Sequence, residues 1–271
     1  MPARVLYGSC PLCGDTKLLE ERVADCSWHP LYQPALGASI RWLRCGGCAH
    51  VFAEGFFGPE VLPLLLERVP ASQRVGEGLQ EARPLAGRMV ERVNALRAAL
   101  GADQRDLTQK PGRWLDVGFG NAALLLTAAE FGYKAVGLDL RSVHVEALRA
   151  LGFEAHQGEL DAFDPGAARP DVISLCDVLE HMPFPKAALL RARELAAPSA
   201  VLLISTPNAE APIWKQMDAG GANPYWGELE HLHNFGRARL FALLAECGLA
   251  PCGYAASERY LAGMEILAVR A

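Results

Sequence analysis

The 271-residue sequence has no uninterrupted apolar run of 18 residues or more, which is about the minimum for a membrane-spanning helix. It also lacks a basic start followed by an apolar stretch, so we expect neither membrane insertion nor a secretory signal. It has no basic run, and its net charge of −5 argues against a broad nucleic-acid-binding face. We therefore expect a cytoplasmic protein that does not bind membranes and for which a nucleic-acid partner is disfavoured.

Cysteine is unevenly distributed, with five of the eight cysteines in the first 48 residues. Clustered cysteines in a chain without a signal peptide indicate a metal site rather than disulfides. Two Cys-x-x-Cys pairs predict one tetrahedral, structural zinc ion, because four thiolates leave no open coordination position. The predicted ligands are Cys10, Cys13, Cys45 and Cys48. Residues 40–43 and 51–52 would be strands of a small zinc ribbon; Cys26 or His29 could replace one ligand, and reduced free thiols are the alternative.

Residues 113–123 (RWLDVGFGNAA) are the stretch around which the chain is organised. An apolar strand-like run contains Asp116, two glycines follow at Gly118 and Gly120, and a helical run starts at Asn121. Glycines allow positive φ and close ligand approach, and a helix start offers unpaired N–H groups. Because the spacing to Ala123 also fits a dinucleotide fingerprint, a nicotinamide-dependent dehydrogenase is one alternative.

Strand-like and helix-like segments alternate regularly after this turn. This order predicts an α/β fold with a doubly wound, mostly parallel sheet whose ligand lies outside the strand C-termini. The expected strands are 134–139, 153–156, 171–176, 200–205, 249–257 and 264–270, and the expected helices are 124–131, 142–151, 185–195 and 236–247.

The sequence divides into a zinc-ribbon-like domain at 1–57, a helical linker or cap at 58–110 and a main domain at 111–271. Within the cap, Pro84 could open a helix that Gly101 closes. Its expected apolar face is Leu85, Met89, Val93, Leu96 and Leu100. This helix could cover the mouth of the active site or simply pack on the sheet, and residues 103–112 would link it to the main domain.

Acidic residues stand at several predicted strand ends. Asp139, followed by Leu140, lies where a carboxylate can accept hydrogen bonds from the ribose hydroxyls of an adenosine ligand. Glu159 and Leu160 follow the third strand and could recognise an adenine edge, with Asp161 as the competing acid. Residues 176–182 (CDVLEHM) would line the site, because ionisable groups beside an apolar strand indicate a site wall.

These segments, in this order, resemble the successive motifs of class I S-adenosylmethionine (SAM)-dependent methyltransferases, near the ubiquinone-type O-methyltransferases and their bacterial relatives. The resemblance rests on DVGFGNA at 116–122, Asp139, Gly158-Glu159 and DVLEH at 177–181. It implies a Rossmann-like, seven-stranded sheet with an antiparallel last strand. Residues 204–208 (ISTPN) and 230–235 (EHLHNF) match late motifs, whereas Ala122 replaces the usual third glycine.

The resemblance also implies roles for individual residues. The implied SAM contacts are Asp116, Gly118, Gly120, Asp139, Leu140, Glu159, Leu160 and Asp177. Methyl transfer to a hydroxyl needs a base; His231, in a loop expected to fold over the site, is the first candidate, with His233 and His181 behind it. Aromatic residues in the insertion 209–229 would form a lid over the substrate, or would pack inward and bury the foot of the inserted loop itself.

The expected reaction is O-methylation of a small polar molecule, sugar or secondary metabolite, with zinc in a structural role. The alternatives are the dehydrogenase, a ribosomal or transfer RNA methyltransferase, and a non-catalytic protein whose ribbon docks a partner or mediates homo-oligomerisation.

Overall fold

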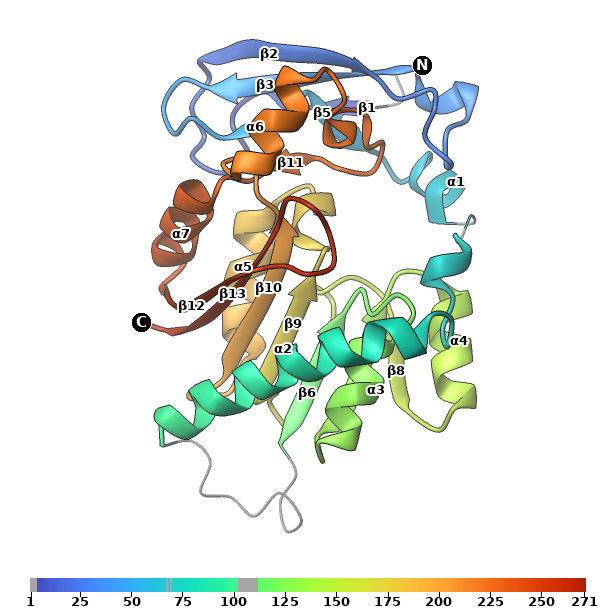
Figure 1. Cartoon of the computed structure of the whole chain (residues 1–271), viewed down its shortest axis with the longest axis vertical. Coiled ribbons are helices and arrows are strands. Elements are labelled where there is room, and N and C mark those ends of the chain that lie inside the picture. Colours follow the sequence, from blue (N-terminus) through green and yellow to red (C-terminus); the bar gives the residue numbers. More distant parts are fainter. Residues whose placement is uncertain (1–3, 67, 69, 102–111) are drawn as a thin grey trace.

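A sheet domain and an N-terminal module that lies across its upper end make up the fold (Figure 1). The computed structural model describes residues 4–66, 68, 70–101 and 112–271. All but the last residue of the predicted linker at 103–112 lies outside the described residues. None of the described helices combines the length and apolarity that a membrane span requires.

The sheet domain confirms the predicted α/β architecture. Its seven strands run in the order β12-β13-β10-β9-β6-β7-β8, and β13 is antiparallel to both of its neighbours whereas the other adjacent pairs are parallel. The strands are β6 (Arg113–Val117), β7 (Lys134–Asp139), β8 (Glu154–Gln157), β9 (Val172–Cys176), β10 (Val201–Pro207), β12 (Leu249–Ala256) and β13 (Gly263–Arg270). Each lies within two residues of its predicted bounds.

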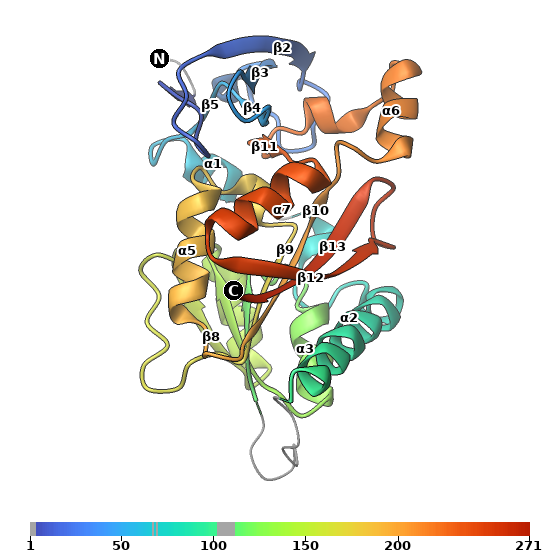
Figure 2. The same ribbon diagram turned by 90° about the vertical axis from the view of Figure 1, so that its left-hand side faces the viewer.

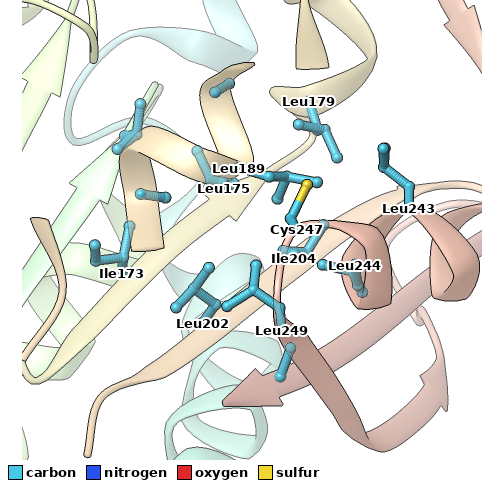
Figure 3. Packing of buried hydrophobic residues seen from close by; sticks show 14 of the residues in the cluster. Ile173, Leu175, Leu179, Leu189, Leu202, Ile204, Leu243, Leu244, Cys247 and Leu249 are labelled. Carbon is cyan, nitrogen blue, oxygen red and sulfur yellow. The ribbon is translucent and has the colours of Figure 1, made fainter. Parts of the chain in front are cut away.

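Helices cover both faces of this sheet (Figure 2). Successive residues of a strand point to opposite faces, so Trp114 of β6 packs under α2 whereas Leu115 packs under α5 and α7. The helices are α2 (Leu79–Ala99), α3 (Ala123–Glu130), α4 (Ser142–Ala150), α5 (Pro185–Leu195) and α7 (Arg237–Glu246). Figure 3 shows the α5/α7 face, where Leu189, Leu243 and Leu244 contact the β9 and β10 side chains. Burying one such leucine contributes about 1.5–3 kcal/mol.

Helix α2 differs from the prediction at its start. It begins at Leu79, so Pro84 lies inside the second turn, where its missing N–H removes a helical hydrogen bond. Met89 and Val93 are buried on the sheet as expected, but Leu100 is half exposed. Packing on the sheet is therefore observed for this helix, and a role in covering the mouth of the active site stays a prediction.

The N-terminal module consists of short antiparallel sheets. β1 (Arg4–Leu6) pairs with β5 (Gly55–Phe57), and a four-stranded sheet has the order β11-β4-β3-β2. The strands of the larger sheet are β2 (Leu18–Asp25), β3 (Ser39–Cys45), β4 (Val51–Ala53) and β11 (His233–Asn234). The last of these comes from the sheet domain, so the module incorporates chain from near the C-terminus. The division of the chain at residue 57 stays a prediction.

The insertion after β10 also belongs to the core of this module. Trp214 and Trp226 are buried there, and the Trp42 indole N–H donates to the Trp226 carbonyl at 2.8 Å. The side chains of these two tryptophans therefore pack inward and fix the inserted segment in the module core. The remaining short elements are α1 (Leu62–Leu66), α6 (Pro212–Ala219) and the 3-10 turns η1 (Pro34–Leu36), η2 (Ala71–Gln73), η3 (Leu179–His181) and η4 (Pro224–Gly227).

Candidate active site

The glycine turn connects the end of β6 to the start of α3. Gly118 and Gly120 have φ of +64° and +49°, and Ala122 has φ of +65° at the helix entrance. A Cβ on Gly118 would lie 2.6 Å from Cγ2 of Val178, so this turn presses against the segment that follows β9. The turn thus needs glycine at position 118 both for its backbone angle and for space.

Asp116 is buried just below this turn. Its carboxylate accepts a 2.5 Å hydrogen bond from the Ser174 hydroxyl, which itself accepts from the Trp114 indole N–H at 2.8 Å. Burial raises the pKa of Asp116 to about 7, although Ser174 and the charge of Arg259 oppose the shift. Because the pKa of this carboxyl group lies near neutral pH, a cation placed close to the glycine turn would favour its ionised form.

Asp139 stands at the end of β7, the strand next to β6. Its Oδ1 accepts from the Arg141 backbone N–H at 2.8 Å, and its Oδ2 lies 3.2 Å from Nδ1 of the buried His144. These contacts hold the carboxylate in one orientation at the carboxyl edge of the sheet. His144, on the first turn of α4, was missed by the sequence prediction, although its spacing of five residues from Asp139 was a usable signal.

The three remaining residues for which the sequence predicts a cofactor contact, Leu140, Glu159 and Leu160, lie beyond the ends of β7 and β8. Glu159 is exposed, and the Leu140 side chain is 36% exposed. The Leu160 side chain is buried in the main core, so any ligand contact from this residue would come from its backbone.

Asp177 follows β9, on the other side of β6 from Asp139. Its φ is +54°, and the Ser205 hydroxyl donates to its Oδ1 at 2.8 Å. An aspartate tolerates this left-handed backbone better than most residues. Asp116, Asp139 and Asp177 therefore surround the glycine turn from three neighbouring strands.

A second polar cluster consists of Glu180, His181 and His231. One ligand-type atom from each lies within 4.8 Å of the other two, and the two imidazole rings meet edge to face with centroids 4.8 Å apart. His181 Nδ1–H donates to the Glu230 carbonyl at 3.0 Å, which leaves Nε2 as the acceptor nitrogen. The Leu232 N–H donates to the Glu180 carbonyl at 2.8 Å and so docks the histidine loop onto η3.

The members of this cluster carry unused hydrogen-bonding capacity. Both carboxyl oxygens of the fully buried Glu180 and Nδ1 of His231 have no partner within the described residues. Burial and the nearby Asp177 raise the pKa of Glu180 well above 4.5, and burial lowers the pKa of His231 well below 6.5. Buried polar atoms without partners are costly in a native protein, so these atoms mark the cluster as a candidate binding site.

His233, the second candidate base of the sequence analysis, does not join that cluster. It lies in β11, where Nε2–H donates to the Met182 carbonyl at 2.9 Å and Nδ1 accepts from His50 Nε2 at 3.0 Å. Both ring nitrogens are occupied, and burial lowers the pKa of His233 to about 3. These contacts assign His233 to holding the module sheet against η3.

The four predicted zinc ligands come together in the N-terminal module. Their sulfurs lie within 4.8 Å of one another, with 3.7 Å between Cys10 and Cys48 and 3.5 Å between Cys13 and Cys45. Four sulfurs at 2.3 Å from one zinc ion are about 3.8 Å apart, so the spacing fits.

The two knuckles have the same backbone turn. Gly14 and Ala49, each the residue after the second cysteine, have φ of +78° and +58°, and each N–H bonds to the carbonyl of the first cysteine. Cys26 and His29 lie elsewhere, because the Cys26 thiol faces the Gly37 carbonyl and His29 contacts Glu228. Neither replaces a member of the four.

Comparison with known families adds a decisive observation to this geometry. Residues 85–251, more than half of the chain, match the family model described as a methyltransferase domain. The chain belongs to this methyltransferase family. The match includes the glycine turn, all three aspartates and the Glu180–His181–His231 cluster, and it replaces the dehydrogenase alternative.

A curated relative is the ubiquinone biosynthesis O-methyltransferase of Pasteurella multocida (strain Pm70), which is 28% identical over 142 residues. The aligned part spans 46% of this chain and 58% of that methyltransferase.

Two solved methyltransferase structures share the fold. One is the 1,6-didemethyltoxoflavin-N1-methyltransferase of Burkholderia thailandensis, with bound 1,6-didemethyltoxoflavin and S-adenosylhomocysteine (TM-score 0.54, 18% identity, 82% of this chain and 95% of that one). The other is the magnesium protoporphyrin IX methyltransferase of Synechocystis PCC 6803 with bound S-adenosylhomocysteine (TM-score 0.52, 19% identity, 72% and 88%).

Proposed function

We propose that this protein transfers a methyl group from SAM to a hydroxyl oxygen of a small polar molecule, a sugar or a secondary metabolite. The observation that carries this proposal is the position of Asp139 and Asp177 on either side of the Gly118–Gly120 turn, in a chain of the methyltransferase family. The proposal places ribose on Asp139, adenine beside Glu159 and Leu160, and the methionine end over Asp116 and Asp177.

Methyl transfer is an in-line displacement at a sulfonium-bound carbon. A carbon–oxygen bond forms as the sulfur–methyl bond breaks, leaving S-adenosylhomocysteine and one proton from the acceptor hydroxyl. His231 is the proposed base for that proton, with His181 beside it, since a neutral imidazole with an unpartnered nitrogen faces the cluster. The protein's main task is to align the two reactants.

The proposal includes a structural zinc ion held by the four clustered thiolates. Such an ion would add to the folding free energy of the module by holding its two cysteine turns together. The Cys10 and Cys45 side chains pack against the same apolar cluster as Phe235, which precedes α7. Zinc binding would thereby support the loop that carries His231.

The first test is calorimetric titration with SAM, S-adenosylhomocysteine and NAD in parallel. Binding of the two adenosyl compounds without NAD is the expected result, and binding of NAD alone would overturn the proposal. The acceptor is then sought by measuring the release of S-adenosylhomocysteine in the presence of phenols, sugars or transfer RNA. Turnover with RNA alone would favour the RNA-methyltransferase alternative.

His231→Gln should lower kcat by about a hundredfold or more while leaving the Kd for S-adenosylhomocysteine within about twofold, because loss of a general base costs 10²–10⁴ in rate. The rate is measured with the first acceptor that the screen identifies. His156→Gln, which alters a partly buried histidine on β8, serves as the matched control. An unchanged kcat in His231→Gln would exclude this base.

Binding of S-adenosylhomocysteine should be about tenfold tighter at pH 8 than at pH 6. Asp116, with a pKa of about 7, is mostly protonated at pH 6 and mostly ionised at pH 8, and only the ionised form attracts the ligand's ammonium group. The charged or titratable groups that act on it are Ser174, Arg259, Asp139 and the Cys176 thiol.

The Asp116 prediction is checked by titrating wild type and Asp116→Asn across this range. The variant should show a flat profile, and so should adenosine binding to wild type, because adenosine lacks the ammonium. A flat wild-type profile with S-adenosylhomocysteine would remove Asp116 from the methionine subsite.

A further inference from the structure

The turn between β12 and β13, residues 257–262, which we name the hairpin tip, projects beyond the carboxyl ends of β9 and β10. Figure 1 shows it in red between β10 and the N-terminal module. The Asn208 N–H, just after β10, donates to the Ala262 carbonyl, and Arg88 of α2 forms an ion pair with Glu258. These two contacts hold the hairpin tip over the edge of the sheet where the glycine turn lies.

Arg259 reaches inward from this tip to Asp177. Its Nη2 lies 2.9 Å from Asp177 Oδ2, while the other carboxylate oxygen is held by Ser205. Its charge also acts on the buried Asp116, two residues before Gly118. One cation therefore faces two acids beside the glycine turn, and the sequence alone had given Arg259 no role.

A guanidinium has five N–H donors in a planar fork, and a single carboxylate accepts hydrogen bonds from only some of them. The methionine end of SAM carries one ammonium and one carboxylate on the same carbon atom. Asp177 and Asp116, together with Arg259, supply a charge of the opposite sign for each of these two groups. Without a ligand the protein's own acid and base neutralise each other; with one, each can pair with the opposite charge of the zwitterion.

We propose that Arg259 binds the carboxylate of the cofactor's amino acid end and so selects ligands that carry it. This inference rests on the proposed function, since it assigns the methionine end to the glycine turn. It makes the hairpin tip part of the cofactor site.

The test compares ligands with and without the carboxylate on the full-length protein. S-adenosylhomocysteine carries it, whereas decarboxylated SAM and 5′-methylthioadenosine do not. Arg259→Ala should weaken S-adenosylhomocysteine binding by about thirtyfold, as loss of a charge-assisted pair would, and change the Kd for the other two by about twofold or less. Arg259→Lys should recover part of the loss.

Arg88→Ala is the matched control, because it frees the tip from α2 without altering the guanidinium at Asp177. If Arg259 only secured the tip, Arg259→Ala and Arg88→Ala would weaken all three ligands alike, and that result would overturn the inference. Unchanged S-adenosylhomocysteine binding in Arg259→Ala would overturn it too. If the wild-type protein bound none of the adenosyl ligands, that result would instead refute the proposed function, and this inference together with it.

Discussion

Asp139→Ala is expected to weaken binding of S-adenosylhomocysteine by about a hundredfold or more. A ribose held by a carboxylate makes two charge-assisted hydrogen bonds, and each such bond contributes about 1.5–3 kcal/mol. The loss would appear in calorimetric titration as a Kd beyond the measurable range. Because the acid lies at the edge of the sheet, the fold should remain intact.

The Asp139 experiment needs controls for the neighbouring His144, which the substitution leaves buried without its partner. Asp139→Asn keeps an oxygen for the Arg141 N–H and loses only the charge. His144→Leu removes the partner and keeps the acid, so it should retain most of the affinity. Asp161→Ala tests the exposed acid that competes with Glu159 at the adenine edge. Wild-type affinity in Asp139→Ala and Asp139→Asn would refute the ribose assignment.

A Cys10→Ser/Cys45→Ser double variant should lose zinc entirely, whereas wild type should hold about one zinc per chain by elemental analysis. A structural zinc contributes on the order of 10 kcal/mol to the folding of a small domain, so the N-terminal module should unfold in the variant. Tryptophan emission reports this directly, because Trp42 and Trp226 pack edge to face in the module core and would become exposed to water.

The double variant should also separate cofactor binding from catalysis. The glycine turn and Asp139 belong to the sheet domain, so affinity for S-adenosylhomocysteine should persist. Turnover should fall, because the histidine loop is anchored to the module through β11. Cys252→Ser, at an exposed thiol of β12, should keep its zinc; a fully folded wild-type protein without metal would refute the zinc assignment.

Local sequence patterns were sufficient for the sheet domain. Most strands were visible as short apolar runs, and a glycine, proline or acid marked the end of each strand from β6 to β10 within a few residues. The glycine turn and Asp139 were predicted together. Asp116 and Asp139 are 23 positions apart in one strand–helix–strand unit, which places them at the ends of adjacent strands. The matched backbone turns at Gly14 and Ala49 likewise follow from each Cys-x-x-Cys segment alone.

Contacts between distant segments could not be read in the same way. His231 and His233 are two residues apart, and the sequence offered both as candidate bases, with His231 first. The pairing of β11 with β4 then turned His233 toward His50, 183 residues away, and left His231 beside Glu180. His231 lies before β11, in the loop that the Leu232 N–H holds on Glu180, whereas His233 lies in the strand itself, so the pairing of β11 with β4 gives the two histidines different neighbours.

The sequence by itself therefore determined the parallel sheet, the glycine turn and the two cysteine knuckles, since each depends on backbone preferences and apolar periodicity over a few residues. Only the tertiary structure decided that β11 completes the N-terminal sheet, that Glu180 is buried against two histidines and that Arg259 meets Asp177. Those contacts arise from packing between segments separated by about 50 to 180 residues, where the free energy of burial, not local propensity, selects the partner.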